Sequence, residues 1–96
     1  MFPLIVTLEA ITEADVPAVA AALARMRPLC LAEPGCQLWE AYHSEADPKV
    51  FVLVEHWESR AHWEAHGKLD AIQTIYLPEV LPRARRAAHP STLLGA

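Results

Sequence analysis

The sequence has few positively charged residues, and they form no large basic cluster. Eight Lys and Arg residues stand against twelve Asp and Glu residues, which gives a net charge of −4. The acids are scattered, and the only basic run is the short segment 83–86, which we expect to be a solvated segment or an ion-pair partner. Such a chain has no field that would attract nucleic acid or an anionic membrane, so neither is expected as a partner.

Long apolar runs and targeting signals are also lacking. No window approaches the roughly 18 uninterrupted apolar residues of a membrane span, and the N-terminus lacks the basic region and cleavage site of a signal peptide. We therefore expect a cytoplasmic protein. Its only two cysteines, Cys30 and Cys36, would then lie in a reducing compartment, where two unclustered cysteines are usually buried thiols rather than a disulfide.

What the sequence has is apolar residues, which make up 53% of a chain of 96. That is enough for one modest core and leaves no room for a second, so a single domain over 1–96 is expected. The fraction is high for so small a lone domain, which has much surface and little interior. Part of the surplus is therefore expected to face a partner subunit.

Local patterns along the chain predict four strands and two helical regions. Ser59 is a good N-cap for the second helical region, and Gly67 either ends or interrupts its first helix. In order, the predicted segments are a strand over 2–10, a helix from 16 to near Pro28 or just beyond it, strands over 36–44 and 50–57, a helical region from Ser59 to Pro78, and a strand between 83 and 91. This order gives an α+β fold with the pattern βαββαβ.

The segment 50–54 is apolar at five consecutive positions. A hairpin strand with one solvent-exposed face would alternate apolar and polar residues, so both faces of this sheet are expected to be buried. Two helical regions can cover only one face. We therefore predict that the other face packs on the same sheet of a second copy, which makes the protein a homodimer.

The segment His62-Trp63-Glu64-Ala65-His66 allows three interpretations. His62 and His66 lie four residues apart on a helix, as metal-binding histidines do, but the position after His62 is Trp63 rather than the glutamate of zinc proteases. A third ligand would have to come from His56, Glu58 or Glu55, and no metal is predicted. In the second interpretation His66 is a hydrogen-bonded core residue. In the third it faces a ligand pocket between helix and sheet, with Trp63 as a wall.

Several short motifs in a fixed order resemble the antibiotic biosynthesis monooxygenase domain family. The matching residues are Glu33-Pro34-Gly35-Cys36, Trp39, Asp47-Pro48, Phe51-Val52-Leu53-Val54-Glu55-His56-Trp57 and His66. The resemblance covers residues 1 to about 77 and reaches the tail, 78–96, only loosely. It implies a ferredoxin-like subunit that pairs through its sheet into a dimeric α+β barrel.

The resemblance also implies a monooxygenase of small phenol- or quinol-type aromatics that needs no cofactor, because the substrate supplies the electrons. Aromatic rings would stack the substrate, and a few polar groups would hold its oxygens. The expected substrate-binding residues are Trp39, Tyr42 and Trp63, and His66 is the expected catalytic residue, as orienting donor or base. Glu55 comes from the family motif, although a buried carboxylate that supports the sheet is the favoured interpretation.

The family that the sequence resembles also includes a branch that degrades haem, with an asparagine on the first strand, a tryptophan on the second helix and a histidine ten residues after it. Haem degradation would need a first-strand asparagine, which is absent, and a histidine ten residues after Trp63, where Gln73 stands. Isomerisation or clearance of a small signalling molecule stays open. So does a dimer without catalysis that binds a small ligand or serves only as a structural module.

Overall fold

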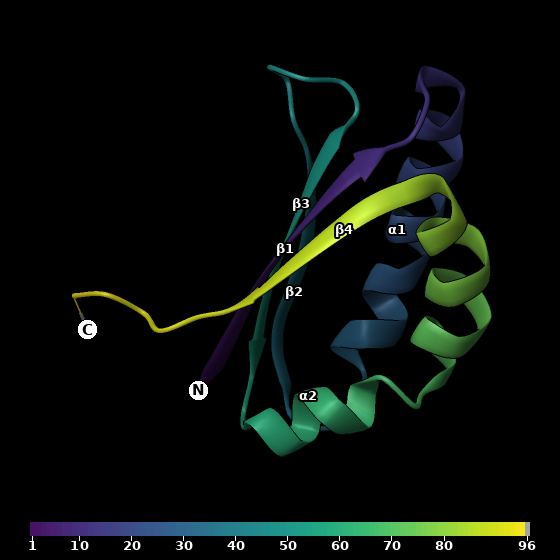
Figure 1. Cartoon of the computed structure of the whole chain (residues 1–96). Helices are drawn as coiled ribbons and strands as arrows, with labels where there is room; N and C mark the ends of the chain where they lie inside the picture. The colour runs from purple at the N-terminus through teal and green to yellow at the C-terminus, as the bar shows by residue number, and fades with distance from the viewer. Residues whose placement is uncertain (96) are drawn as a thin grey trace.

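The computed structural model of the protein describes residues 1–95, and it shows a four-stranded antiparallel sheet with all the helices on one face (Figure 1). The elements in order are β1 (Phe2–Ala10), η1 (Glu13–Asp15), α1 (Val16–Leu31), β2 (Cys36–His43), β3 (Val50–Trp57), α2 (Arg60–His66), η2 (Ala71–Val80), η3 (Leu81–Arg83) and β4 (Ala84–Pro90). The predicted ferredoxin-like βαββαβ fold is confirmed. None of the helices in this part of the chain has the length and apolarity that a membrane crossing would need.

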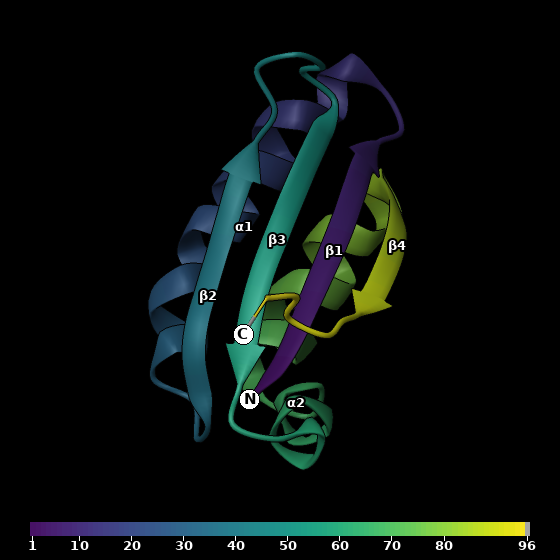
Figure 2. The ribbon, with the colours of Figure 1, turned by 90° about the vertical axis from the view of Figure 1, so that its left-hand side faces the viewer.

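The strand order is β2-β3-β1-β4, so the two hairpin strands lie beside the two terminal ones. Figure 2 looks onto the face of the sheet that no helix covers, with α1 and η2 behind it. Residues 91–95, which follow β4, leave the sheet on this open side (Figure 1).

The alternation of strand residues divides the sheet into two faces. The face under the helices carries the core side chains Leu4, Val6 and Leu8 of β1, Phe51, Leu53 and Trp57 of β3, and Trp39 of β2. Helix α1 packs Val19, Leu23 and Met26 onto them, and η2 adds Ile75 and Val80. The open face carries Ile5 and Val54, which lie opposite each other and are half-buried.

Local signals set the helix starts. Ser59 is the N-cap of α2, and its side chain accepts a hydrogen bond from the His62 backbone N–H. Asp15 accepts hydrogen bonds from both the backbone N–H and the hydroxyl of Thr12 ahead of α1. Pro17 lies in the first turn of α1, where its missing N–H costs nothing.

The helical stripe does not end at Pro78, as the sequence suggested, but continues to Val80. Segment η2 is a π-helix, in which the Leu81 N–H donates to the carbonyl of Tyr76, five residues earlier. Proline normally stops an α-helix because it lacks an N–H and its ring crowds the preceding turn. Here the wider helix contains Pro78, and the chain reaches the start of β4 without a long loop.

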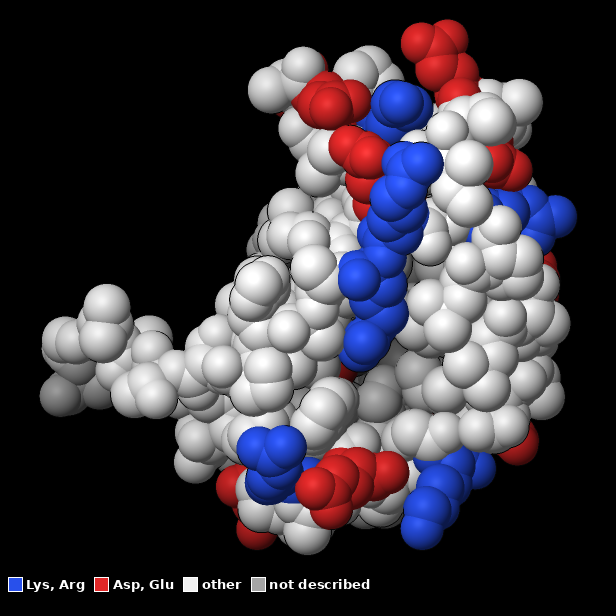
Figure 3. Space-filling model, in the orientation of Figure 1, with Lys and Arg blue, Asp and Glu red and all other residues white. Residues whose placement is uncertain are grey.

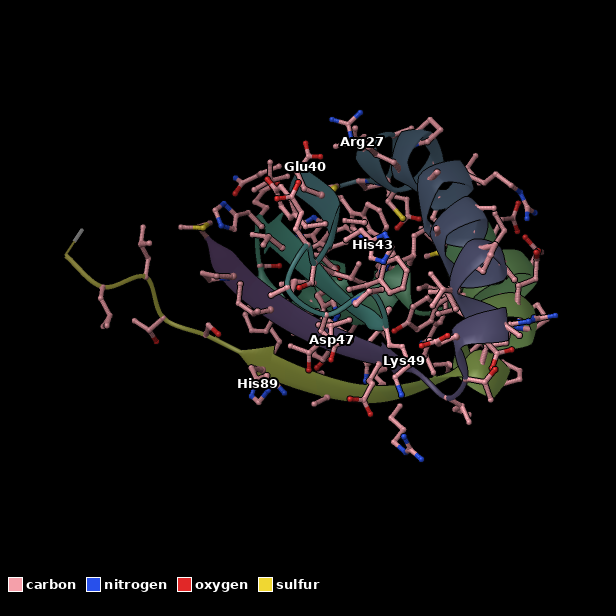
Figure 4. The ribbon with its side chains drawn as sticks, turned by 90° about the horizontal axis from the view of Figure 1, so that it is seen from above. Arg27, Glu40, His43, Asp47, Lys49 and His89 are labelled. Atoms are coloured by element: carbon pink, nitrogen blue, oxygen red, sulfur yellow. The ribbon has the colours of Figure 1, made fainter. Side chains whose placement is uncertain are left out.

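At the edge of the sheet, β2 is tied to α1 by a pair of hydrogen bonds. Arg27 and Glu40 reach toward each other (Figure 4) and form a bidentate ion pair with N···O distances of 3.0 and 2.8 Å. Bidentate geometry is the strong form of an arginine–carboxylate contact. Helix α1 is thereby held against β2, where it forms one side of the interior.

Candidate functional site

A cavity of about 290 Å³ lies between the covered face of the sheet and the helices. Figure 3 shows this side of the molecule hollowed between β4 and the helical layer, beside a line of basic side chains. Apolar side chains form most of the wall, and the lining includes Leu4, Val6, Met26, Leu53, Ile72 and Leu77. The polar groups on it are few, which is typical of small-molecule pockets.

His66 at the end of α2 lies on the wall of this cavity and is only 4% exposed. Its Nδ1 is 2.5 Å from Oε1 of Glu33, which lies in the turn after α1. The ring of Trp57 packs on the imidazole, with 4.6 Å between centroids. His66 is therefore fixed on one edge by a carboxyl group and on one face by an indole.

Burial shifts both members of this pair toward their uncharged forms. It raises the pKa of the Glu33 carboxyl to about 7. It also lowers the pKa of the His66 imidazole, although the nearby Glu55 carboxylate opposes that shift. A pair that gains or loses a proton near neutral pH can serve as a general base or acid.

Glu55 of β3 is also buried on the cavity wall, at 3% exposure. Its Oε1 accepts a hydrogen bond of 2.9 Å from the Trp57 indole N–H. Burial raises the pKa of Glu55, and the bond from Trp57 opposes that shift. Trp39 of β2 lies directly opposite Glu55 in the strand register and lines the same cavity.

Tyr76 and Arg86 form a further polar group on the wall. The Arg86 Nε donates to the Tyr76 hydroxyl oxygen at 3.0 Å. Burial raises the pKa of Tyr76, and the Arg86 charge opposes this. Because the tyrosine oxygen accepts from Arg86, its own O–H is available to donate to a ligand oxygen.

Trp63 of α2 forms part of the wall and stacks on Phe2, with 5.4 Å between ring centroids. The guanidinium of Arg60 lies over both rings, 5.6 Å from the Phe2 centroid and 5.7 Å from the Trp63 centroid. Arg60 also pairs with Glu64, one turn along the helix. The aromatic wall predicted from Trp63 is thus held in place by contacts with Phe2 and Arg60.

The structure separates the two histidines of the metal interpretation. The His62 Nδ1 is 2.7 Å from Ser59 Oγ, and its ring lies against Gly35. His66 instead joins Glu33 and Cys30, whose potential ligand atoms all lie within 4.8 Å of one another. These three are the only group within residues 1–95 that offers ligands for a metal ion. Glu33 is already bonded to His66, and burial raises the pKa of the Cys30 thiol, which keeps it protonated.

Four of the five predicted site residues line the cavity: Trp39, Glu55, Trp63 and His66. Tyr42 does not. It pairs with Val52 on the open face of the sheet, and 57% of it is exposed. Trp39 and Tyr42 are three positions apart on one strand, so the two-residue alternation places them on opposite faces.

Three residues of the site were not predicted from the sequence: Tyr76 and Arg86, which line the cavity, and Glu33, which is bonded to His66. Glu33 was identified only as part of the family motif, Tyr76 lay within the helical region from Ser59 to Pro78, and Arg86 lay in the basic run 83–86. Arg86 follows the inward-facing Ala84 by two positions on β4. Strand alternation was therefore the signal that could have placed it.

Comparisons with known proteins agree with this fold. The sequence profile of the family described as antibiotic biosynthesis monooxygenase matches residues 1–76. No functionally curated protein matches the chain.

Solved structures share the fold at low sequence identity. A conserved protein from Bacteroides thetaiotaomicron superposes with a TM-score of 0.87 at 20% identity, over 96% of both chains. A protein described as an antibiotic biosynthesis monooxygenase gives a TM-score of 0.84 at 17% identity, over 96% of this chain and 98% of its own. A protein from Shewanella oneidensis gives 0.78 at 24% identity, over 94% and 90%.

Proposed function

Because the chain belongs to the antibiotic biosynthesis monooxygenase family, we propose that it is a monooxygenase that needs no cofactor and acts on a small phenol- or quinol-type aromatic. The observation that carries this proposal is that His66, on the wall of a mostly apolar cavity, is hydrogen-bonded to the buried carboxyl group of Glu33. A flat apolar substrate would stack on Trp63 and pack on the aliphatic wall. The pair would face the substrate as the orienting or proton-accepting group.

For this reaction the protein needs only to remove a proton from the substrate and to stabilise the resulting anion. The pair formed by His66 and Glu33 removes a proton from the bound aromatic, and the resulting anion transfers electrons to O₂ and forms a C–O bond. With an anthrone as substrate, a CH₂ group becomes a C=O group, and the second oxygen atom leaves as water. The four electrons that O₂ accepts all come from the substrate. The cavity lowers the cost of the anion through the donors Tyr76 and Arg86.

The proposal extends to a homodimer formed through the open face of the sheet. Half-buried apolar residues lie at its centre, among them Leu38, Val52 and Val54. No helix of the described chain covers this face (Figure 2). An apolar sheet face of this kind is stabilised when it packs on another sheet.

Oxygen consumption tests the proposed activity. Chelator-treated protein without added flavin should consume O₂ with an anthrone or a naphthohydroquinone. The His66→Ala variant should lose about 10²-fold or more of that rate, the usual contribution of a general base. His62→Ala is the matched control, because His62 lies on the same helix but outside the cavity lining. If the protein consumes no O₂ with any member of a broad panel of such phenols, the proposal is refuted.

A further inference from the structure

Trp39 carries a buried donor without a partner. Its Nε1 is the one side-chain nitrogen or oxygen within residues 1–95 that is itself shielded from solvent and makes no hydrogen bond. The residue itself is fully buried and lines the cavity. A buried unpaired N–H costs free energy, so native proteins rarely keep one without a reason. The Trp39 N–H thus lacks an acceptor, which a ligand in the cavity would supply.

Glu55 supplies an acceptor beside it. Trp39 and Glu55 are directly opposed on neighbouring antiparallel strands, and such residues have Cβ atoms about 5 Å apart. The Trp57 N–H is bonded to Oε1 of Glu55, and Oε2 has no hydrogen-bond partner among the described residues. The cavity therefore presents an unpaired N–H donor and an unpaired carboxylate oxygen from adjacent strands.

We propose that Trp39 and Glu55 form a subsite for a hydroxyl group of the ligand. A hydroxyl is the small group that can both accept from the Trp39 N–H and donate to Glu55 Oε2. An ether oxygen could only accept, and a carbonyl oxygen would face the carboxylate without a proton between them. The inference rests on the proposed function, because it places the aromatic ligand in the same cavity.

The position of Tyr76 and Arg86 narrows the ligand class further. Strands β2 and β4 are separated by β3 and β1, which puts their backbones about 14 Å apart at roughly 4.8 Å per strand, and Arg86 is also offset along the strands, because Pro90 rather than Arg86 is in register with Trp39. The Tyr76 and Arg86 donors suit a second oxygen on the far side of the ligand. The cavity then selects an aromatic that carries a hydroxyl at one end and another oxygen at the other, as a fused-ring quinol does.

Indole NMR tests the subsite directly. The chain has three tryptophans, so the indole N–H signals can be assigned with single Trp→Phe variants. Naphthohydroquinone, added without O₂ so that it is not consumed, should shift the Trp39 indole signal. Its dimethyl ether, which lacks the O–H, should bind about tenfold more weakly, the effect of one hydrogen bond to a charged group.

The variants Glu55→Gln and Glu64→Gln separate this contact from a general loss of charge. Glu55→Gln keeps the shape, and because its single oxygen is needed to accept from the Trp57 N–H, it presents an NH₂ donor in place of Oε2. The tenfold preference for quinol over diether should therefore vanish. Glu64 also lines the cavity but is exposed and pairs with Arg60. Glu64→Gln should therefore keep the preference.

The outcomes separate this inference from the proposed function. Quinol binding with an unmoved Trp39 signal, or a preference that survives Glu55→Gln, would overturn the subsite and leave the oxygenase proposal standing. The expected shifts without any O₂ consumption would support the subsite and refute the oxygenase. If neither compound binds, both ideas fail.

Discussion

The Nδ1 of His66 lies 2.5 Å from the Oε1 of Glu33, although 33 positions separate the two residues in the chain. The turn after α1 and the last turn of α2 must both be in place to form this contact. Burial raises the pKa of the Glu33 carboxyl and lowers the pKa of the His66 imidazole, so it favours the neutral form of both groups. The pair therefore couples the state of protonation to the stability of the fold.

This coupling predicts a pH-dependent effect of Glu33→Gln. The folded-state pKa of Glu33 is about 7, against an ordinary value of 4.5. A carboxyl group whose pKa is raised by folding contributes stability that is complete below the unfolded pKa and is lost as the pH rises through the folded pKa. The free energy of unfolding of Glu33→Gln, relative to the parent, should therefore rise by about 1–2 kcal/mol from acidic pH to about pH 8.

The measurement is urea unfolding at several pH values. His66 acts in the opposite sense, because its lowered pKa gives stability that is lost as the pH falls. His66 is present in both proteins and keeps a hydrogen-bonding side chain beside it in Glu33→Gln, so most of its contribution cancels in the difference between them. Glu45→Gln, in the exposed hairpin loop, is the control for loss of one carboxylate. A difference between Glu33→Gln and the parent that stays constant with pH would contradict the prediction.

Gly35 predicts a second effect on stability. Its φ is +77°, and a Cβ at this position would collide with the His62 ring. Gly35→Ala should cost about 1–2 kcal/mol for the left-handed backbone alone, and more for the contact with His62. Gly67→Ala is the matched control, because Gly67 ends α2 with a helical φ of −59° and its nearest neighbour would be 3.4 Å away. Thermal unfolding that ranks Gly35→Ala as stable as Gly67→Ala would refute this role.

Most of the fold could be predicted from the sequence because its signals are local. Strand β1 covers the predicted range, and the predicted final strand is found as β4 (Ala84–Pro90). The exception is η2, whose continuation past Pro78 depends on a π-helical hydrogen bond. The known preference of proline refers to the α-helix, so the sequence predicted that the helix ends at Pro78. The chain instead forms a π-helix, whose wider turn contains Pro78.

The site was harder to predict, because it depends on which side chains meet. Trp39, Glu55 and His66 were found through the family motif and do line the cavity. Tyr42 was placed with them by residue type, although alternation along the strand already separated it from Trp39. The contact of Glu33 with His66 joins two segments that are distant in sequence, and no local sequence pattern predicts such a contact.

Removal of metal provides a third prediction. The proposed reaction uses no metal, so dialysis against a chelator should leave O₂ consumption unchanged. Cys30→Ser should also leave it unchanged, because the buried thiol only packs beside Glu33 and His66. The measurement is metal analysis of the purified protein together with activity before and after dialysis. Stoichiometric zinc that is lost in Cys30→Ser would show that Cys30, Glu33 and His66 bind a metal after all.

The open face of the sheet provides the last prediction. Val54 lies at its centre, opposite Ile5 on one neighbouring strand and, on the other, Glu40, whose two carboxylate oxygens are both bonded to Arg27. If two copies pack through this face, Val54→Lys would bury an unpaired charge at their interface, which costs several kcal/mol. Dissociation should then become at least about a hundredfold easier, since each 1.4 kcal/mol is a factor of ten.

Light scattering coupled to size exclusion measures this at micromolar concentration. The parent should elute as a dimer and Val54→Lys as a folded monomer, with the folded state checked by circular dichroism. Ala61→Lys, on the exposed side of α2 away from the sheet, should remain a dimer. The apolar open face would need another explanation if the parent were monomeric under these conditions. A Val54→Lys dimer would instead place the contact elsewhere on the molecule, because a sheet-to-sheet interface cannot hide a lysine at its centre without a partner for its charge.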